Sequence, residues 1–386
     1  MIDNTIELFF ALVRAGLFPV HDEGFMVNES LFQDVDWEKV YQLAQEQSVQ
    51  GVVLQGIEMV QGSWLKVHGS PLVPKILLLQ WIGEVQVIEK QNKDMNVFIA
   101  DLIEKLRKYD IYTLLIKGQG IAQCYDKPLW RVSGDIDLLS SKDDYDKAKS
   151  FLLPKGVLTE PEEAAKRHLA MQIEQWAVEL HGTLHVGLSA RVDRMLDNVQ
   201  YDIFYRGKVR SWQNGKTQVF LPAANEDVVY VFAHILQHFY KGGIGLRQIC
   251  DWCRLLWTYR ESLNNEYLES KIREAGLMSE WKAFGALAVK YLGMPIEAMP
   301  LLNDNLNANL NRKADRICEF ILEVGNFGHN RDNSYFQKHS YIVQNSISAW
   351  RRVKDLCRHA TIFPVNSVRF FFGIMYNGIL STLRGE

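Results

Sequence analysis

The chain has 386 residues, of which 47% are hydrophobic and 23% are charged, and this balance is typical of a globular protein with a sizeable core rather than a disordered chain. The formal net charge of −3 argues against an extended nucleic-acid surface, although a local basic patch is compatible with it. The five cysteines are odd in number and scattered, which argues against a disulfide framework and favours a reducing compartment.

The apolar stretches do not predict a membrane or secreted protein. Residues 370–380 form an apolar run of 11 residues between Arg369 and Arg384, whereas a bilayer-spanning helix needs about 20. Asp3 and Glu7 interrupt the first apolar run, and no basic region precedes it, so the start does not resemble a signal peptide. We therefore expect a cytoplasmic protein with no membrane partner.

The first 110 residues have the pattern of helices. Apolar residues fall at helical spacing from Ile6 to Ile57, with Asp36 as the expected N-cap of one helix. A long helical pattern then covers residues 73–108. Because no Ser-, Gly- or Pro-rich linker follows, we expect a helical unit over residues 1–110 that packs directly on the next unit.

Residues 111–221 change to short apolar runs, which predict a small mixed sheet. The expected strands are residues 111–116, 134–139, 175–185 and 219–221. Residues 118–125 suit one or two helical turns, and Ser141 is the expected cap of a helix over residues 142–153. The whole chain is therefore predicted to be α+β, with a sheet core at residues 111–221 flanked by helical units.

Helical patterns return over residues 222–386, which we expect to form a C-terminal helical domain. Asn225 is the expected cap of a helix that reaches Tyr240, and a second helix is predicted after Gly242 and Gly243. Further segments compatible with helix are residues 267–276, 279–291, 310–324, 334–358 and 365–383.

Two acids on one predicted strand are the main functional signal. Alternate strand residues share a face, so Asp135 and Asp137 should point the same way, while Ile136 and Leu138 face a core. Paired carboxylates repel each other and lose hydration, so a cation usually lies beside them, and Mg²⁺ prefers such oxygen ligands. The alternative is that Asp135 caps a turn and Asp137 is solvated on an edge strand.

The residues around these acids resemble a known family. Lys117-Gly118, then Tyr125-x-x-Pro128-x-x-Arg131-x-x-Gly134-Asp135-Ile136-Asp137-Leu138, is similar to a group of uncharacterised bacterial nucleotidyltransferases within the DNA polymerase beta-like superfamily. Gly245-Leu246-Arg247-Gln248 with Asp251 resembles the downstream helical signature of that group. The resemblance implies transfer of a nucleoside monophosphate from an NTP to an acceptor, with two Mg²⁺ ions on Asp135, Asp137 and a third carboxylate.

Glu179 is the residue that we match to the third carboxylate. It alternates with Val178 and Leu180 in the predicted strand and should share its face with His181. In this interpretation Asp135 and Asp137 bridge both ions, and Glu179 completes the metal site and could act as base toward the acceptor.

The predicted nucleotide-binding residues are Lys117, Gly118, Arg131, Gly134 and Arg247. Gly118 would let the backbone approach a phosphate at the start of a helix, and Lys117 and Arg131 are candidate phosphate cations. The alternatives are a surface ion pair for Lys117 and a tie between Arg131 and Asp126. Arg247 either faces the cleft or pairs with Asp251, four residues later on the same helix.

Three other clusters have simpler interpretations. We expect a packed histidine pair rather than a metal site at His234 and His238, and buried thiols rather than zinc ligands at Cys250 and Cys253. The basic residues Arg206, Lys208, Arg210 and Lys216 predict a solvated hairpin, with contact to a nucleic acid or an anionic acceptor as the alternative.

Gln119 supports a second functional hypothesis. The wider superfamily has Gly or Ser at this position, so a catalytically silent nucleotide-binding or regulatory module with the same fold is the alternative to an enzyme. A third hypothesis is a helical scaffold with only a vestigial sheet. The acceptor stays open among a small molecule, a protein side chain and an RNA end, and we expect the helices after residue 224 to form its pocket.

Overall fold

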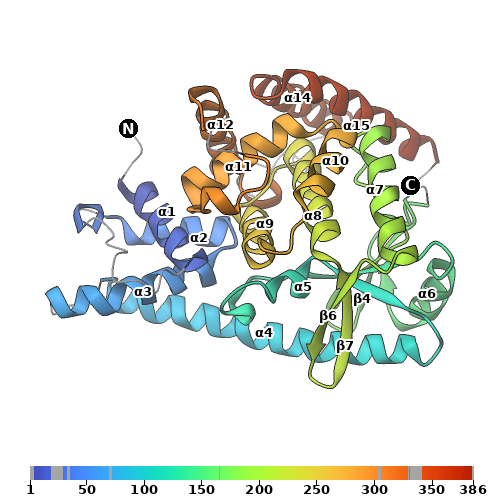
Figure 1. Ribbon diagram of the computed structural model, residues 1–386, viewed down its shortest axis with the longest axis horizontal. Coiled ribbons are helices and arrows are strands. Elements are labelled where there is room, and N and C mark those ends of the chain that lie inside the picture. The colour runs from blue at the N-terminus through green and yellow to red at the C-terminus, as the bar shows by residue number, and fades with distance from the viewer. Residues whose placement is uncertain are drawn as a thin grey trace.

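The computed structural model describes residues 4–18, 29–32, 35–68, 72–164, 166–302, 306–328, 330 and 341–384. Helices surround one five-stranded mixed sheet and one two-stranded hairpin (Figure 1), which confirms the predicted α+β fold class. Every helix within these ranges is too short or too polar to cross a bilayer. The division into units 1–110, 111–221 and 222–386 stays a prediction.

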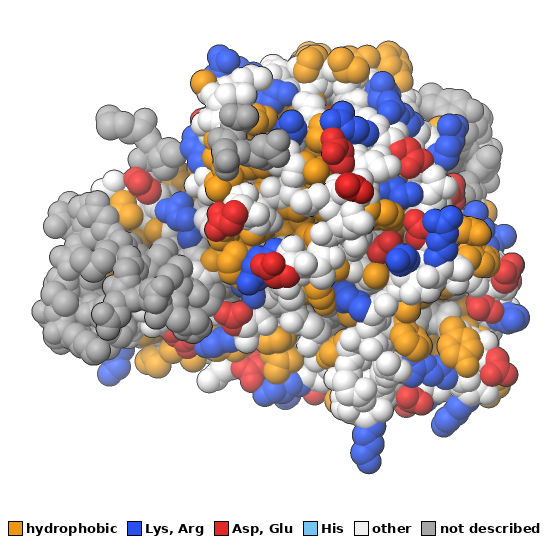
Figure 2. All heavy atoms as spheres, viewed as in Figure 1, with side chains coloured by type: hydrophobic (Ala, Val, Ile, Leu, Met, Phe, Trp, Pro, Cys, Tyr) orange, Lys and Arg blue, Asp and Glu red, His pale blue; other side chains and the backbone are white. Residues whose placement is uncertain are grey.

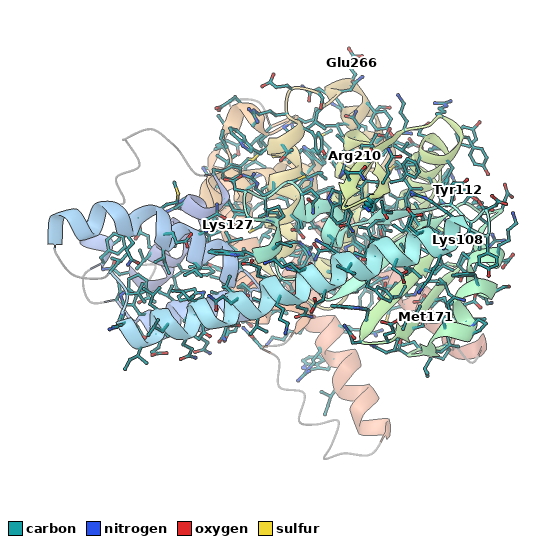
Figure 3. All side chains as sticks on the ribbon, turned by 90° about the horizontal axis from the view of Figure 1, so that it is seen from below. Lys108, Tyr112, Lys127, Met171, Arg210 and Glu266 are labelled. Carbon is teal, nitrogen blue, oxygen red and sulfur yellow. The ribbon has the colours of Figure 1, made fainter. Side chains whose placement is uncertain are left out.

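The N-terminal helices are α1 (Asn4–Leu17), α2 (Trp37–Glu46), α3 (Gln50–His68) and α4 (Lys75–Arg107), with the short 3-10 helix η1 (Glu29–Phe32). Asp36 caps α2 as predicted, because its side chain accepts a hydrogen bond from the Lys39 amide at 3.0 Å. Helix α4 crosses the whole molecule, from the other N-terminal helices to the sheet, and ends beside Lys108 (Figures 1 and 3).

The central sheet has the strand order β1-β2-β5-β4-β3. Its strands are β1 (Thr113–Ile116), β2 (Asp135–Ser140), β3 (Val157–Leu158), β4 (His168–Ile173) and β5 (Trp176–His181). Strands β2 and β5 are parallel, and the other pairs are antiparallel. The sequence did not predict β3 or β4. The prediction that β5 extends to residue 185 was wrong, because its partner β4 begins at His168, opposite His181, and leaves later residues without a paired strand.

The two faces of the sheet differ in polarity. Ile136, Leu138, Val178 and Leu180 point into an apolar core with residues of α4 and of α6 (Tyr145–Leu152). The opposite face carries the acids of β2 and β5, as the period of two requires. Helix α6 begins three residues later than predicted, since the Ser141 hydroxyl accepts a hydrogen bond from the Asp144 amide at 3.0 Å and forms a turn there.

The remaining elements of this region are the short helices α5 (Gly118–Ala122), η2 (Pro128–Trp130) and η3 (Leu153–Lys155), the longer helix α7 (Ala190–Tyr205), and a hairpin of β6 (Val209–Asn214) and β7 (Thr217–Pro222). The predicted strand at residues 219–221 is part of β7, and the basic loop forms the predicted hairpin with β6. Within this hairpin Arg210 is bonded to the buried Asp227, so its charge is already neutralised.

The C-terminal helices are α8 (Ala224–Lys241), α9 (Leu246–Tyr259), α10 (Asn265–Ala275), α11 (Met278–Leu292), η4 (Ile296–Ala298), α12 (Ala308–Val324), η5 (Asn326–Gly328), α14 (Tyr341–Ala360) and α15 (Pro364–Arg384). The predicted segment 334–358 starts outside the described residues. Asn225 is not a cap, because Ala223 holds that position and the Asn225 side chain instead accepts a hydrogen bond from the Asn264 amide.

Candidate active site

A cleft of about 280 Å³ lies between the polar face of the central sheet and the helices α8 and α9. Its lining includes most of the predicted site residues together with several histidines: Lys117, Gly118, Arg131, Asp135, Asp137, His168, Glu179, His181, Tyr230, His234, His238, Arg247 and Asp251. Gly134 lies one residue before β2, and a Cβ built on it would meet no atom within 4 Å, so packing does not require a glycine there.

The three predicted carboxylates come together on the sheet. Asp137 lies opposite Glu179 in the parallel pair of β2 and β5. One oxygen each from Asp135, Asp137 and Glu179 lie within 4.8 Å of one another. The alternative that Asp137 is solvated on an edge strand was wrong, because β2 lies between β1 and β5 and Asp137 is only 1% exposed.

The charges around Asp135 are not balanced. The negative charge of Asp137 raises the pKa of Asp135, burial raises it further, and Lys117 opposes this only in part. The ionised form of Asp135 is therefore disfavoured unless further positive charge is supplied. Three carboxylates that lack enough neighbouring positive charge provide the oxygen ligands that Mg²⁺ prefers.

Lys117 reaches the acids through an unusual backbone. Its φ of 58° and ψ of −151° lie near a region that is almost restricted to glycine, and Gly118 follows with a φ of 46°. This turn between β1 and α5 brings the Lys117 ammonium 2.7 Å from Asp137 Oδ1 and 3.3 Å from His234 Nε2. The alternative of a surface ion pair for Lys117 was wrong, because this pair is buried. A strained residue at this position is typical of a functional site.

Two histidines contact the same acids. His181 Nε2 lies 2.9 Å from Asp137 Oδ1 and 3.4 Å from Glu179 Oε2, and His168 Nε2 lies 3.1 Å from Glu179 Oε2. Burial alone would raise the pKa of Glu179, but hydrogen bonds from His168 and His181 outweigh it and lower that pKa. Burial likewise opposes the protonated form of His181, yet Asp137 and Glu179 raise its pKa.

The wall beside α9 holds a second ion pair. Arg131 donates two hydrogen bonds to Asp251, from Nε at 2.9 Å and from Nη2 at 2.6 Å, and the Tyr125 hydroxyl donates a third at 2.8 Å. The predicted alternatives were both wrong, since Arg131 is not tied to Asp126 and Arg247 does not pair with Asp251. Arg247 Nη1 instead donates to the Val132 carbonyl at 2.9 Å.

The sequence of this region identifies a family. Residues 33–293 match the family model described as an uncharacterised nucleotidyltransferase. The chain belongs to this nucleotidyltransferase family. The match covers every predicted site residue, while comparisons with curated proteins and with solved structures give no match. Membership supports a nucleotidyl-transfer function in general.

Gln119 has a structural role in this nucleotidyltransferase fold. It is buried, and its Nε2 donates to Asn92 Oδ1 at 2.6 Å and to Ser133 Oγ at 3.1 Å. Asn92 Nδ2 in turn donates to the carbonyls of Leu129 and Arg131 at 2.7 and 2.8 Å. Gln119 and Asn92 therefore fasten the loop that carries Arg131 onto α4, a function that its position after Gly118 did not indicate.

The other predicted clusters are packed side chains. His234 and His238 lie with their Nε2 atoms 3.1 Å apart in the cleft wall, and burial lowers the pKa of both. Cys250 and Cys253 are buried free thiols, as predicted. Sequence reasoning missed His168, although the alternation of Leu169, Met171 and Ile173 was a signal for the strand that carries it.

Proposed function

We propose that this member of the nucleotidyltransferase family moves a nucleoside monophosphate from an NTP to an acceptor with the help of divalent metal ions. The observation that carries the proposal is the convergence of Asp135, Asp137 and Glu179, whose oxygens lie within 4.8 Å at the floor of the cleft. These residues would hold Mg²⁺, which when bound acidifies an acceptor hydroxyl and neutralises the pyrophosphate leaving group.

The cleft also offers cations for a triphosphate. Arg247 has a buried Nε with no hydrogen-bond partner among the described residues, and burial followed by repulsion from Arg131 lowers its pKa. A buried guanidinium with unused donors is stabilised by an anionic ligand. Lys117 is a second cation at the acids. Helix α5 has only five residues, so we assign the phosphate contacts to these side chains rather than to a helix start at Gly118.

A catalytically silent nucleotide-binding or regulatory module is the second candidate. It is favoured by the protein's own neutralisation of two acids, since Lys117 and His181 contact Asp137 while His168 and His181 contact Glu179. Gln119 no longer favours this alternative, because its side chain points away from the cleft into the contact with Asn92. A helical scaffold would not need the three carboxylates together, as they are here.

The acceptor is the least constrained part of the proposal. Helices α8 and α9 line the cleft opposite the sheet, as expected for helices that select an acceptor. On the face shown in Figure 2, Lys and Arg side chains are interspersed with Asp and Glu, so this face presents no continuous basic surface for a long nucleic acid. The acceptor stays open among a small molecule, a protein side chain and an RNA end. The free thiols fit a cytoplasmic location.

The test uses the purified chain with Mg²⁺ and each of the four NTPs. Calorimetry measures nucleotide binding, pyrophosphate release measures turnover, and mass spectrometry of lysate with labelled NTPs identifies a product heavier by one nucleotide. We compare wild type with the double variant Asp135→Asn, Asp137→Asn and with Asp101→Asn, which changes an exposed acid on α4.

We expect binding and transfer in wild type and in Asp101→Asn, and a loss of transfer by a factor of at least about 100 in the double variant. Nucleotide binding without pyrophosphate release across all acceptor fractions would favour the silent module. Absence of nucleotide binding in wild type, or binding and transfer that survive in the double variant, would overturn the proposal.

A further inference from the structure

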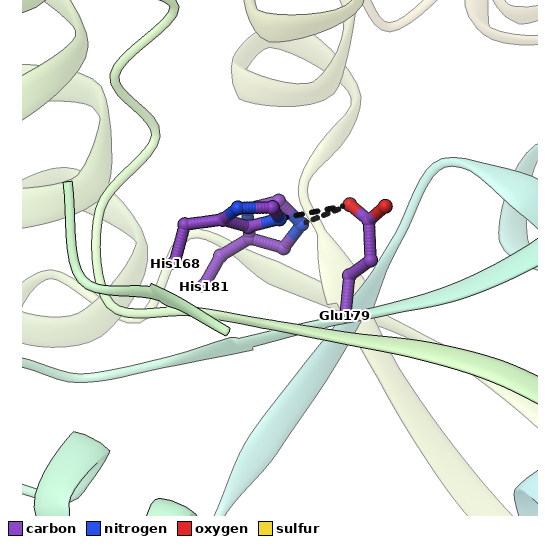
Figure 4. Close-up of side chains that lie close together, drawn as sticks. All are labelled: His168, Glu179 and His181. Carbon is purple, nitrogen blue, oxygen red and sulfur yellow. Dashed lines mark hydrogen bonds and ion pairs between the residues drawn. The ribbon is translucent and has the colours of Figure 1, made fainter. Parts of the chain in front are cut away.

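Glu179 belongs to a second group of ligand atoms besides the carboxylate group. His168 on β4 and His181 on β5 are directly paired across the two strands, and their rings lie 4.7 Å apart with an interplanar angle of 37°. Figure 4 shows both imidazoles side by side with their Nε2 atoms directed at the Glu179 carboxylate. These three side chains thus present two nitrogens and one oxygen to the same space.

The spacing of these atoms is suited to a metal ion. In a tetrahedral zinc site with bonds of about 2.1 Å, neighbouring ligand atoms are about 3.4 Å apart. Glu179 Oε2 lies 3.1 Å from His168 Nε2 and 3.4 Å from His181 Nε2. Asp137 Oδ1 also lies 2.9 Å from His181 Nε2, but the Lys117 ammonium binds this oxygen at 2.7 Å, so we do not count it as a ligand. The ligand atoms of His168, His181 and Glu179 all lie within 4.8 Å of one another, and a water molecule or substrate would complete a tetrahedral site.

The chemistry of the ligands differs from that of the carboxylate group. Mg²⁺ prefers oxygen ligands alone, whereas imidazole nitrogens favour Zn²⁺ and related transition-metal ions. Metal-bound histidines usually direct their other ring nitrogen at a carboxylate or carbonyl. Glu163 Oε1 lies on that side of His168, 3.9 Å from Nδ1. Two unlike sets of ligands thus meet at Glu179.

We propose that Glu179 lies between two different cation positions. The first, with Asp135 and Asp137, takes Mg²⁺, and this half rests on the proposed function. The second, formed by His168, His181 and Glu179, takes an imidazole-preferring divalent ion such as Zn²⁺, and it stands on the geometry of these three side chains alone. The active site would then use a mixed pair of metals rather than two Mg²⁺ ions.

The experiment measures Zn²⁺ and Co²⁺ binding to the full chain after chelator treatment, without nucleotide. Calorimetry gives the Zn²⁺ affinity and stoichiometry, and the visible absorption of bound Co²⁺ reports the coordination geometry. The variants are His168→Asn, His181→Asn and His168→Gln, with His234→Asn as the matched control, since His234 and His238 form the other histidine pair in the cleft. Circular dichroism checks that each variant is folded.

We expect wild type and His234→Asn to bind one Zn²⁺ per chain, and the variants at His168 and His181 to bind it at least about 100-fold more weakly, because loss of even an outer partner of a ligand costs 10- to 100-fold. The inference is overturned if wild type binds no Zn²⁺ at one equivalent, if the affinity survives in folded variants at His168 and His181, or if His234→Asn alone abolishes it.

Nucleotide binding with Mg²⁺ alone separates this inference from the proposed function. Mg²⁺-dependent nucleotide binding and transfer without any Zn²⁺ site would refute only the second cation position. A Zn²⁺ site at His168 and His181 in a chain that binds no nucleotide would refute the proposed function and leave the metal site in place.

Discussion

Two buried ion pairs border the cleft, and they are built differently. Arg131 and Asp251 are 6% and 5% exposed at the side chain, and Lys117 and Asp137 are 13% and 1% exposed. The Arg131 pair is complete, because Asp251 receives two hydrogen bonds from the guanidinium and one from Tyr125. The Lys117 pair has additional acids beside it, and Asp137 raises the pKa of the neighbouring Asp135.

This difference between the two ion pairs indicates which one holds the cleft in shape and which one takes part in its chemistry. A buried pair with every donor and acceptor satisfied gains little from a ligand, but it fixes the loop and the helix that it joins. A buried pair with additional acids beside it leaves negative charge uncompensated, and a cation or a phosphate-bound metal can neutralise that charge. We therefore assign the Arg131 pair to the architecture of the cleft and the Lys117 pair to its chemistry, and the predictions below test this division.

The largest expected effect is on stability, from Asp251→Ala. The substitution leaves the Arg131 guanidinium buried without its partner, so the free energy of unfolding should fall by about 3–5 kcal/mol. Urea denaturation at neutral pH measures it. Asp126→Ala is the matched control, since Asp126 pairs with Arg254 but is 41% exposed and should cost about 1 kcal/mol or less. Equal losses of unfolding free energy in the two variants would show that the Arg131 pair does not have this architectural role.

The sequence predicted the three carboxylates of the cleft better than the ion pair between Arg131 and Asp251. Asp135, Asp137 and Glu179 were placed correctly on one face because the side chains of a strand alternate, and this rule needs only local information. Arg131 and Asp251 are 120 residues apart, and the local rule for residues four apart on a helix offered only Arg247 as an alternative partner for Asp251. Asp251 thus pairs with an arginine from a distant loop and not with the arginine on its own helix.

The histidine contacts and the role of Gln119 needed the tertiary structure as well. His168 reaches Glu179 only because β4 pairs with β5 in a particular register. Gln119 contacts Asn92 of α4 and follows two residues, Lys117 and Gly118, that both adopt positive φ. Neither register nor backbone angle is contained in a short motif, so the fold class was predictable while these contacts were not.

The second prediction concerns pH, because the charge of Lys117 also reaches His238. Burial, followed by the positive charge of Lys117, lowers the pKa of His238 to about 4, whereas an unfolded histidine has a pKa of about 6.5. As the pH falls below 6.5, the unfolded chain takes up the proton first, so wild type should lose about 2 kcal/mol between pH 7.5 and pH 5 from this group.

Chemical denaturation of wild type and His238→Asn at several pH values measures this loss. The variant should lack the part of the pH dependence that lies between pH 6.5 and about 4, and His234→Asn should resemble it, since burial and Lys117 also lower the pKa of His234. Parallel stability curves for wild type and both variants would show that the folded protein does not lower the pKa of these two histidines.

The third prediction is that Arg247 binds the nucleotide and does not stabilise the fold. Arg247→Ala removes a guanidinium whose Nε is unpaired among the described residues, so Mg²⁺-nucleotide affinity should fall by about tenfold or more while the melting temperature stays near that of wild type. Arg260→Ala, at the other end of α9, is the control and should change neither quantity. A loss of stability comparable to that of Asp251→Ala, at unchanged affinity, would make Arg247 a structural brace.

The smallest expected effect is a gain in stability, from Asp135→Asn. The folded protein raises the pKa of Asp135, because repulsion from Asp137 and then burial disfavour its carboxylate. Asp135→Asn keeps the shape and removes this repulsion, so the metal-free variant should be more stable by on the order of 1 kcal/mol while it loses transfer. The gain should shrink as the pH falls toward 3.8, because Asp135 then takes up a proton in the folded state before it does so in the unfolded chain.

Thermal denaturation with and without Mg²⁺ completes this test. Mg²⁺ should raise the melting temperature of wild type and have a smaller effect on Asp135→Asn, since at a given concentration an ion that binds only the folded state stabilises it more when it binds more tightly. Asp101→Asn, which removes an exposed pair with Lys105 on α4, should be nearly as stable as wild type and keep its response to Mg²⁺. If Asp135→Asn instead destabilises the metal-free protein, the charge of Asp135 is already balanced in the fold, and the two ion pairs do not differ in the way proposed.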